Sequence, residues 1–234
     1  MSSINFTSVA SEIPKSHGHF QRKCAGGGGG PVRSMVLRPV SEEEIEKVVL
    51  SLNSKKSCDS NGMSTWLLKQ CIRYILTPLT TIINLSFSTG TFPDSLKIAK
   101  VTPIFKKDDP YQASNYRPIS ILPVFSKIFE KLFCNRLENF LETQEILSPQ
   151  QFGFRKNKST IDAINNLVDS ILEGMEIREH VLSIFLDLSK AFDCVEHETL
   201  LHQLENVGVR GLLHIWLSAY LRGREQCVQI SGIK

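Results

Sequence analysis

The residues with the clearest chemical potential lie in VLSIFLDLSKAFDCV, residues 181–195. The unbroken apolar run before Asp187 predicts a strand that is buried on both faces. A carboxylate at the end of such a rigid strand lies beside solvent at a fixed depth, as a Mg²⁺ ligand must. Aspartate also ends many strands because it favours turns, and spacing alone favours that second interpretation. Asp187 is therefore a candidate metal ligand whose partner ligands must come from elsewhere.

Residues just after this expected strand could contact a nucleotide. If the chain turns there, the backbone amides near Lys190 and Ala191 could face a phosphate held by the metal. Phe192 would then form a flat wall beside a sugar; the alternative is that it belongs to the core. For Asp193 we prefer a structural role as the start of the next helix.

A group of cations lies in a predicted β-hairpin. β-Branched and aromatic residues flank a polar turn, which predicts strands at residues 97–105 and 116–121. Such a hairpin brings Lys106 or Lys107 back toward Arg117. Together they could clamp a triphosphate, because lysine supplies a point charge and arginine a two-pronged donor. A solvated hairpin tip is the more common interpretation of these charges.

The segment QQFGFRKNKST, residues 150–160, predicts a basic loop. A glycine between two phenylalanines lets the backbone approach a partner closely, and the aromatic rings could stack on bases. Arg155, Lys156 and Lys158 could contact phosphates. The alternative is a loop whose phenylalanines anchor it to the core, and spacing gives the two interpretations equal weight.

Helices are expected to position most of these residues. Ser41 should cap the first helix, with Glu44 as its capping-box partner. Two amphipathic segments follow, one before and one after Pro78. The most regular apolar periodicity runs from Val124 to Leu141 and predicts a long helix. Further helices are expected near residues 161–172, 197–206 and 211–221, and a new strand opens in RGREQCVQISG.

Composition bounds the broad class of protein. The 234 residues are 41% hydrophobic and carry a net charge of +3, so the chain can bury a core and permits nucleic-acid binding. Six cysteines without a C-x-x-C pair, and no apolar signal core, indicate reduced thiols in an intracellular protein. No apolar run approaches the length of about 18 residues that a membrane helix needs. Residues 1–38 are glycine-rich and aperiodic, so we expect a flexible tail.

Three segments together resemble the reverse transcriptase of non-LTR retrotransposons of the LINE or jockey type. They are VTPIFKKDDPYQASNYRPISILPVFSKIFEKLFCNRL, LSPQQFGFRKNKSTIDAI and FLDLSKAFDCVEHETLLHQL, in that order. The resemblance covers residues 42–234. KKSCDSNGMS is similar to a further element of the family, Lys-Ser-x-Gly-x-Asp-Gly, in degraded form. Cys58 replaces its usual small or proline-like residue, and Ser60 precedes Asn61-Gly62.

The resemblance implies roles for the residues near Asp187. Asp187 corresponds to the first catalytic aspartate, a ligand of both Mg²⁺ ions, and the carbonyl of Leu188 would bind one of them. Phe192 corresponds to the aromatic gate against a ribose 2′-OH. Lys190 and Ala191 would lie against the triphosphate.

The resemblance also implies roles for the hairpin and the basic loop. Lys106, Lys107 and Arg117 correspond to fingers residues that hold the phosphates of the incoming nucleotide. The template strand would contact the loop of Gln151, Phe152, Gly153, Phe154 and Arg155. The implied partners are an RNA template, a DNA primer and deoxynucleoside triphosphates.

The implied fold class is α+β, the right-hand fold of polymerases. Residues 39–95 would form a helical extension to the fingers, and residues 96–234 the fingers and the first part of the palm. The family's next elements, a Pro-Gln-Gly loop and a Tyr/Phe-Ala-Asp-Asp hairpin, do not occur in the sequence. Because two divalent ions need more than one carboxylate, we expect a fragment without polymerase activity of its own. The strand before Asp187 would lack its neighbour in an incomplete palm sheet, which leaves its apolar face exposed.

Two other functions fit parts of the sequence. The hairpin and the basic loop are also consistent with a nucleic-acid-binding module without catalysis. A phosphatase that uses Asp187 as nucleophile would need an Asp-x-Asp-x-Thr/Val motif after the strand. Ser189 and Ala191 occupy the two informative positions. The binding module is therefore the stronger alternative.

Overall fold

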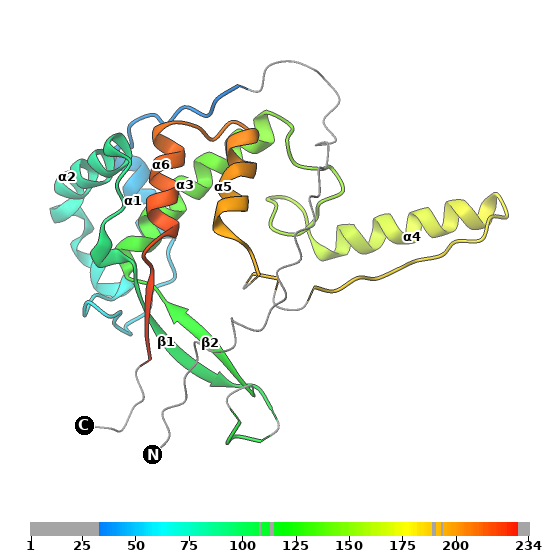
Figure 1. Cartoon of the computed structure of the whole chain (residues 1–234), viewed down its shortest axis with the longest axis horizontal. Helices are drawn as coiled ribbons and strands as arrows, with labels where there is room; N and C mark the ends of the chain where they lie inside the picture. Colours follow the sequence, from blue (N-terminus) through cyan, green and yellow to red (C-terminus); the bar gives the residue numbers. More distant parts are fainter. Residues whose placement is uncertain (1–32, 108, 113–114, 189–190, 193, 229–234) are drawn as a thin grey trace.

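The computed structural model of the chain describes residues 33–107, 109–112, 115–188, 191–192 and 194–228 (Figure 1). Contacts join α1 to α2 and α3, and α6 to α2 and α5. The helices are α1 (Glu42–Ser51), α2 (Thr65–Thr89), α3 (Val124–Thr143), α4 (Thr160–Glu176), α5 (His197–Asn206) and α6 (Leu212–Leu221). Within these described ranges, none of the helices is both long and apolar enough to cross a membrane. The expected helices are confirmed, with ends shifted by a few residues.

Trp216 of α6 lies at the centre of the core and is 1% exposed. Its ring stacks on Phe133 of α3 with ring centroids 4.9 Å apart, and it packs against Phe87 of α2 at 4.9 Å. The indole N–H donates to the hydroxyl of Ser86 at 3.0 Å, so burial leaves no polar atom of this side chain unpaired. One side chain thus joins three helices that are far apart in the sequence.

Two expectations about α1 and α2 change. The hydroxyl of Ser41 accepts from the amide of Glu44 and confirms the cap, but the Glu44 carboxylate pairs with Arg136 at 2.8 Å instead of completing a capping box. α2 continues through Pro78 as one helix of 25 residues. An interior proline costs about 3 kcal/mol. Here Leu68 and Ile72 before it and Leu79, Ile83 and Phe87 after it are all buried, and this packing outweighs the cost.

The sheet has three strands in the order β2-β1-β3. β1 (Ile98–Phe105) and β2 (Tyr116–Ile121) pair antiparallel and form the predicted hairpin. β3 (Glu225–Val228) is the predicted late strand and pairs parallel with β1, with Lys100 opposite Cys227. A short 3₁₀ helix, η2 (Asp94–Leu96), leads from α2 into β1. The structure is therefore α+β, helix-rich with a small mixed sheet.

Asp59 connects the polar turn after α1 to the start of α3. It is 8% exposed. One carboxylate oxygen accepts from the amides of Asn61 and Met63, both at 2.9 Å, and the other accepts from the amide of Val124 at 2.7 Å. Val124 begins α3, where a negative charge is favoured because the first amides of a helix lack intrahelical partners. The degraded KKSCDSNGMS element therefore has a structural role in this chain.

Replacing Asp59 with alanine is expected to lower the stability by about 1–3 kcal/mol, because three amides lose a buried acceptor. Thermal unfolding followed by circular dichroism measures the change. Asp109→Ala is the matched control, since the Asp109 carboxylate is exposed and, among the described residues, accepts only from the amide of Tyr111 at 2.9 Å. An equal loss of melting temperature in both variants would contradict the role given to Asp59.

Two segments depart from the expected organisation. Met35, within the expected tail, is buried and its amide donates to the carbonyl of Gly208 at 2.9 Å, so packed structure begins before residue 38. Residues 1–32, the rest of that tail, lie outside the described residues. α4 projects away from the helical body in Figure 1 and buries none of its residues.

Candidate functional site

The segment before Asp187 is not a strand in the structure. Residues 181–188 are irregular and exposed, and run back alongside α4 (Figure 1). Leu182, Phe185 and Leu186 are 84%, 81% and 89% exposed. The prediction of a buried strand is wrong here because, within the described residues, no neighbouring strand supplies the hydrogen bonds that a strand requires. The expected exposure of its apolar side chains is confirmed.

Asp187 is exposed in this segment. Across the described part of the chain, no three side chains of His, Cys, Asp or Glu gather in a way that could hold a metal ion. These residues therefore do not fit the two-metal site that the resemblance implies. The roles of Asp187 and the Leu188 carbonyl stay predictions, and Ala191 lies in an exposed turn. Lys190 and Asp193 lie outside the described residues.

Phe192 lies beside Phe154 of the basic loop. Their ring centroids are 6.1 Å apart and the rings are nearly perpendicular, an edge-to-face arrangement that is favourable for aromatic pairs. Phe192 is 79% exposed and Phe154 90% exposed, so neither is a core residue. The structure thus brings the expected sugar contact together with the expected template loop, which lie 38 residues apart in the sequence.

Arg155 is an internal anchor of the loop. Its guanidinium donates to both carboxylate oxygens of Glu142 on α3, at 2.9 and 2.5 Å, and to the carbonyl of Ser148 at 2.8 Å. The side chain is only 12% exposed. These hydrogen bonds hold the pKa of Glu142 below its usual value. The Arg155 guanidinium is therefore committed to the protein, in contrast to the phosphate contact expected from the sequence.

The other two cations of the loop also have partners within the protein. Lys156 pairs with Glu138 of α3 at 2.9 Å, although its side chain is still 68% exposed. Hydrogen bonding from Lys156 keeps the pKa of Glu138 below its usual value. Lys158 donates to the carbonyl of Pro149, and its ammonium lies 4.8 Å from the centre of the Phe152 ring. The loop is thus fastened to α3 by charge pairs.

This fastening supports a strained conformation at Phe154. Its φ angle is +57°, in a region that bulky side chains rarely adopt. Such strain costs on the order of 1–3 kcal/mol and persists only where the surroundings impose it. Arg155, the next residue, is held by three hydrogen bonds. The result is an aromatic ring that projects into solvent from a fixed loop.

The cations of the hairpin are placed differently. In the register of β1 and β2, Arg117 lies opposite Ile104, and the amide of Lys106 donates to the carbonyl of Asn115 at 2.8 Å. Lys106 and Arg117 are therefore diagonal neighbours on one face of the hairpin. Lys107 follows in the exposed tip. Unlike the loop cations, these three make no ion pair with a described residue. The expected clustering of Lys106 and Arg117 is confirmed, and their role stays a prediction.

The hairpin and the segment around Asp187 lie apart in Figure 1. The structure therefore brings together two of the expected groups, the loop and Phe192, and leaves the hairpin cations separate from them. Glu138 and Glu142 are important residues that sequence reasoning missed. Their signal was a pair of acids four residues apart on a helix that precedes a basic loop.

Comparison with known proteins decides the family. Residues 104–233, more than half of the chain, match the family described as "Reverse transcriptase (RNA-dependent DNA polymerase)". The chain belongs to the reverse transcriptase family. The match begins in β1 and includes the hairpin cations, the basic loop, Asp187 and Phe192. All of the candidate residues therefore lie within the reverse transcriptase domain.

Curated relatives indicate the kind of reverse transcriptase. The chain is 31% identical over 198 residues to "Probable RNA-directed DNA polymerase from transposon BS" of Drosophila melanogaster, which covers 84% of this chain and 22% of that protein. It is 30% identical over 202 residues to "RNA-directed DNA polymerase from mobile element jockey" of the same organism, covering 86% of this chain and 22% of that protein. The chain thus spans about a fifth of the length of these relatives. The expected likeness to reverse transcriptases of the jockey type is confirmed.

The attachment of the loop is expected to weaken in acid. Because the folded pKa of Glu142 is lowered, its pairing with Arg155 is fully present above the unfolded pKa of about 4.3 and is lost as the pH falls through the lower folded value. Hydrogen exchange of a peptide spanning residues 148–158, corrected for the intrinsic rate at each pH, should show protection at pH 6 that declines toward pH 3.

Glu142→Gln keeps the shape of the side chain and removes its charge. This variant should show the low protection already at pH 6, whereas a peptide from α1 should behave alike in both proteins. Equal protection of the loop in the variant and the wild type at pH 6 would contradict the proposed anchoring.

Proposed function

We propose that this chain is the fingers and the first part of the palm of an RNA-templated DNA polymerase from a non-LTR retrotransposon. The family reaction is the Mg²⁺-dependent addition of deoxynucleotides to the 3′-OH of a DNA primer. The observation that carries the proposal is the match over residues 104–233, a range that contains each of the candidate residues. The division into an extension at residues 39–95 and fingers and palm at residues 96–234 is part of the proposal.

The hairpin is proposed to bind the phosphates of the incoming nucleotide. Lys106 and Arg117 lie on one face, and Lys107 lies in the tip next to them. All three are exposed and free of ion pairs within the described residues, so a phosphate would not have to displace a carboxylate. Lysine provides a compact charge and arginine a fork that fits phosphate oxygens.

The loop is proposed to contact the template strand through its aromatic ring and backbone. Phe154 offers an exposed flat surface for base stacking, and Phe192 beside it would contact the sugar of the nucleotide. Gln151, Phe152 and Gly153 are proposed to contact the template strand as well. Arg155 acts through the loop, which it holds against Glu142. Lys190 and Ala191 are proposed to lie against the triphosphate.

Asp187 and the Leu188 carbonyl are proposed to contribute to Mg²⁺ binding. Two-metal phosphoryl transfer requires more than one carboxylate. The described residues do not bring a set of metal-ligating side chains to Asp187. The chain on its own is therefore proposed to be inactive in primer extension.

Removing the hairpin cations is expected to weaken binding to a primer–template duplex. The variant Lys106→Ala/Lys107→Ala/Arg117→Ala should bind at least about tenfold more weakly. The slope of the logarithm of the binding constant against the logarithm of the salt concentration should also fall in magnitude by up to about 3, because each phosphate contact contributes about 1 to it. Fluorescence anisotropy with an RNA template annealed to a DNA primer, at several salt concentrations, measures both quantities.

The matched control is Lys47→Ala/Arg73→Ala/Lys131→Ala, which removes the same charge from exposed positions on α1, α2 and α3. This control should retain most of the affinity. If the two triple variants weaken binding equally, net charge and not the hairpin governs binding, and the assignment of the hairpin fails.

Primer extension tests the proposed inactivity. The purified chain, incubated with a primer–template, Mg²⁺ and the four deoxynucleoside triphosphates, is expected to leave the primer at its starting length on a denaturing gel. A competent reverse transcriptase on the same substrate is the positive control. Robust extension by this chain, lost on Asp187→Asn, would overturn the proposed inactivity.

A nucleic-acid-binding module without catalysis is the second candidate. The hairpin cations favour it, because they form no ion pair with any residue that the structure describes. The two candidates differ in their response to nucleotide. In a reverse transcriptase fragment, the correct deoxynucleoside triphosphate should strengthen the complex with primer–template through the hairpin cations. A simple binding module would show no such response.

A further inference from the structure

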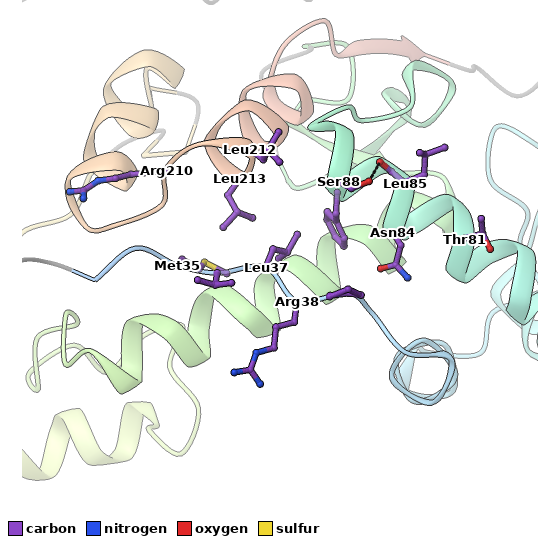
Figure 2. A pocket seen from close by; sticks show the side chains of 13 residues that line it. Met35, Leu37, Arg38, Thr81, Asn84, Leu85, Ser88, Arg210, Leu212 and Leu213 are labelled. Carbon is purple, nitrogen blue, oxygen red and sulfur yellow. Dashed lines mark hydrogen bonds between the residues drawn. The ribbon is translucent and has the colours of Figure 1, made fainter.

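An open groove of about 840 Å³ lies between residues 35–39, the C-terminal half of α2 and the start of α6 (Figure 2). Leu213 points from α6 toward the opposite wall, where Met35 and Leu37 lie. The lining is largely apolar, and parts of it face solvent, since Leu85 is 60% exposed and Leu212 53% exposed. Exposed apolar surfaces of this kind commonly bind another protein segment.

The charges around the groove have one sign. Arg38 and Arg210 are among its lining residues and are exposed, and the lining contains no aspartate or glutamate. The remaining polar lining groups are neutral, from Thr81, Asn84 and Ser88. A segment that fits this groove should therefore combine an apolar face with acidic side chains beside it.

α4 has these properties and lies on the same chain. Its apolar residues recur at spacings of three and four, as in helices that bind grooves. The stripe is exposed along its whole length, by 44% to 68%, at Ile161, Ile164, Val168, Leu172 and Met175. No residue of α4 is buried against the helical body.

The acidic residues of α4 form a line along one side of this stripe. They are Asp162, Asp169, Glu173 and Glu176, at spacings of seven, four and three, and the helix contains no lysine, arginine or histidine. At about 100° per residue these four positions fall within one narrow sector next to the apolar stripe. The helix thus offers an apolar face with an acidic border to a groove that is apolar with basic lining residues.

We propose that two copies of this chain associate by placing α4 of each copy in the groove of the other. α4 projects away from the helical body (Figure 1). It lies apart from α2 and α6, whose residues line the groove of the same chain. Reciprocal exchange uses the same surfaces on both copies and closes a two-fold symmetric dimer. The proposal is independent of the proposed polymerase function, because it uses neither the hairpin cations nor Phe154 and Phe192.

Sedimentation velocity over a range of concentrations tests the proposal with the full chain. The wild type should show a concentration-dependent shift from one to two chain masses. Val168→Glu places a charge in the apolar stripe, and Leu85→Glu places one in the groove. Each should weaken dimerisation at least about tenfold. Ser170→Glu, on the opposite side of α4, adds the same charge and should leave the dimer intact.

Charge reversal supplies an independent test. Arg38→Glu/Arg210→Glu in one preparation and Asp169→Lys/Glu173→Lys in another should each lose dimerisation at low salt. An equimolar mixture should restore the association, since both helix–groove contacts of a mixed dimer then pair opposite charges. Far-ultraviolet circular dichroism of each variant checks that the helices are retained.

Several results would overturn the proposal. A wild type that is monomeric at all concentrations excludes the dimer. A dimer that is weakened by the α4 variant and not by the groove variant excludes the groove as the binding site. A dimer that resists both variants and is lost on Phe185→Ser/Leu186→Ser would place the contact on residues 181–188 instead.

Discussion

The packing of Trp216 against α2 and α3 is the interaction on which the rest of the structure depends. The side chain is almost fully buried, contacts aromatic rings from both helices and has its indole N–H paired with Ser86. The chain enters β1 soon after α2, and β3 follows α6 within a few residues. Because β1 and β3 pair in the same sheet, the helical body fixes where the hairpin begins. Loss of such a buried aromatic side chain typically costs about 3–5 kcal/mol.

The cations of the basic loop and those of the hairpin have different roles at the expected nucleic-acid surface. The cations of the basic loop are paired with carboxylates and carbonyls of the protein, whereas those of the hairpin are exposed without such partners in the described residues. A paired and nearly buried guanidinium binds a phosphate more weakly than a free one, because its existing hydrogen bonds must first be broken. In return, the pairing holds Phe154 in an uncommon backbone conformation beside Phe192. The loop is therefore organised to present an aromatic ring, and the hairpin to present charge.

Large apolar side chains are exposed to solvent in several parts of the structure. α4 and residues 181–188 together expose a series of large apolar residues, while the groove exposes others. Gly174 allows α4 and residues 181–188 to approach closely. A Cβ at position 174 would lie 2.5 Å from a methyl carbon of Val181. Surfaces of this kind are stabilised by burial, so association is the physical outcome that they favour. Their chemical complementarity within one chain is the basis for the dimer.

The sequence by itself determined the secondary structure of most of the chain and the family to which it belongs. Apolar periodicity from Val124 to Leu141, the β-branched and aromatic residues of the hairpin and the Ser41 cap each reflect local physics, and each predicted element appears in the structure. The motifs indicated the family, and the match over residues 104–233 confirms it.

Tertiary structure decided the rest. Pro78 stays within one helix because both halves of α2 are buried, and Asp59 serves as a buried acceptor because α3 begins next to it. The run before Asp187 is apolar enough for a strand, yet a strand exists only when a neighbour completes its hydrogen bonds. Similarly, the sequence shows that Arg155 is a cation, but only the fold shows that Glu142 lies within reach of it. Local pattern fixes what a segment can form, and contacts between distant residues select what it does form.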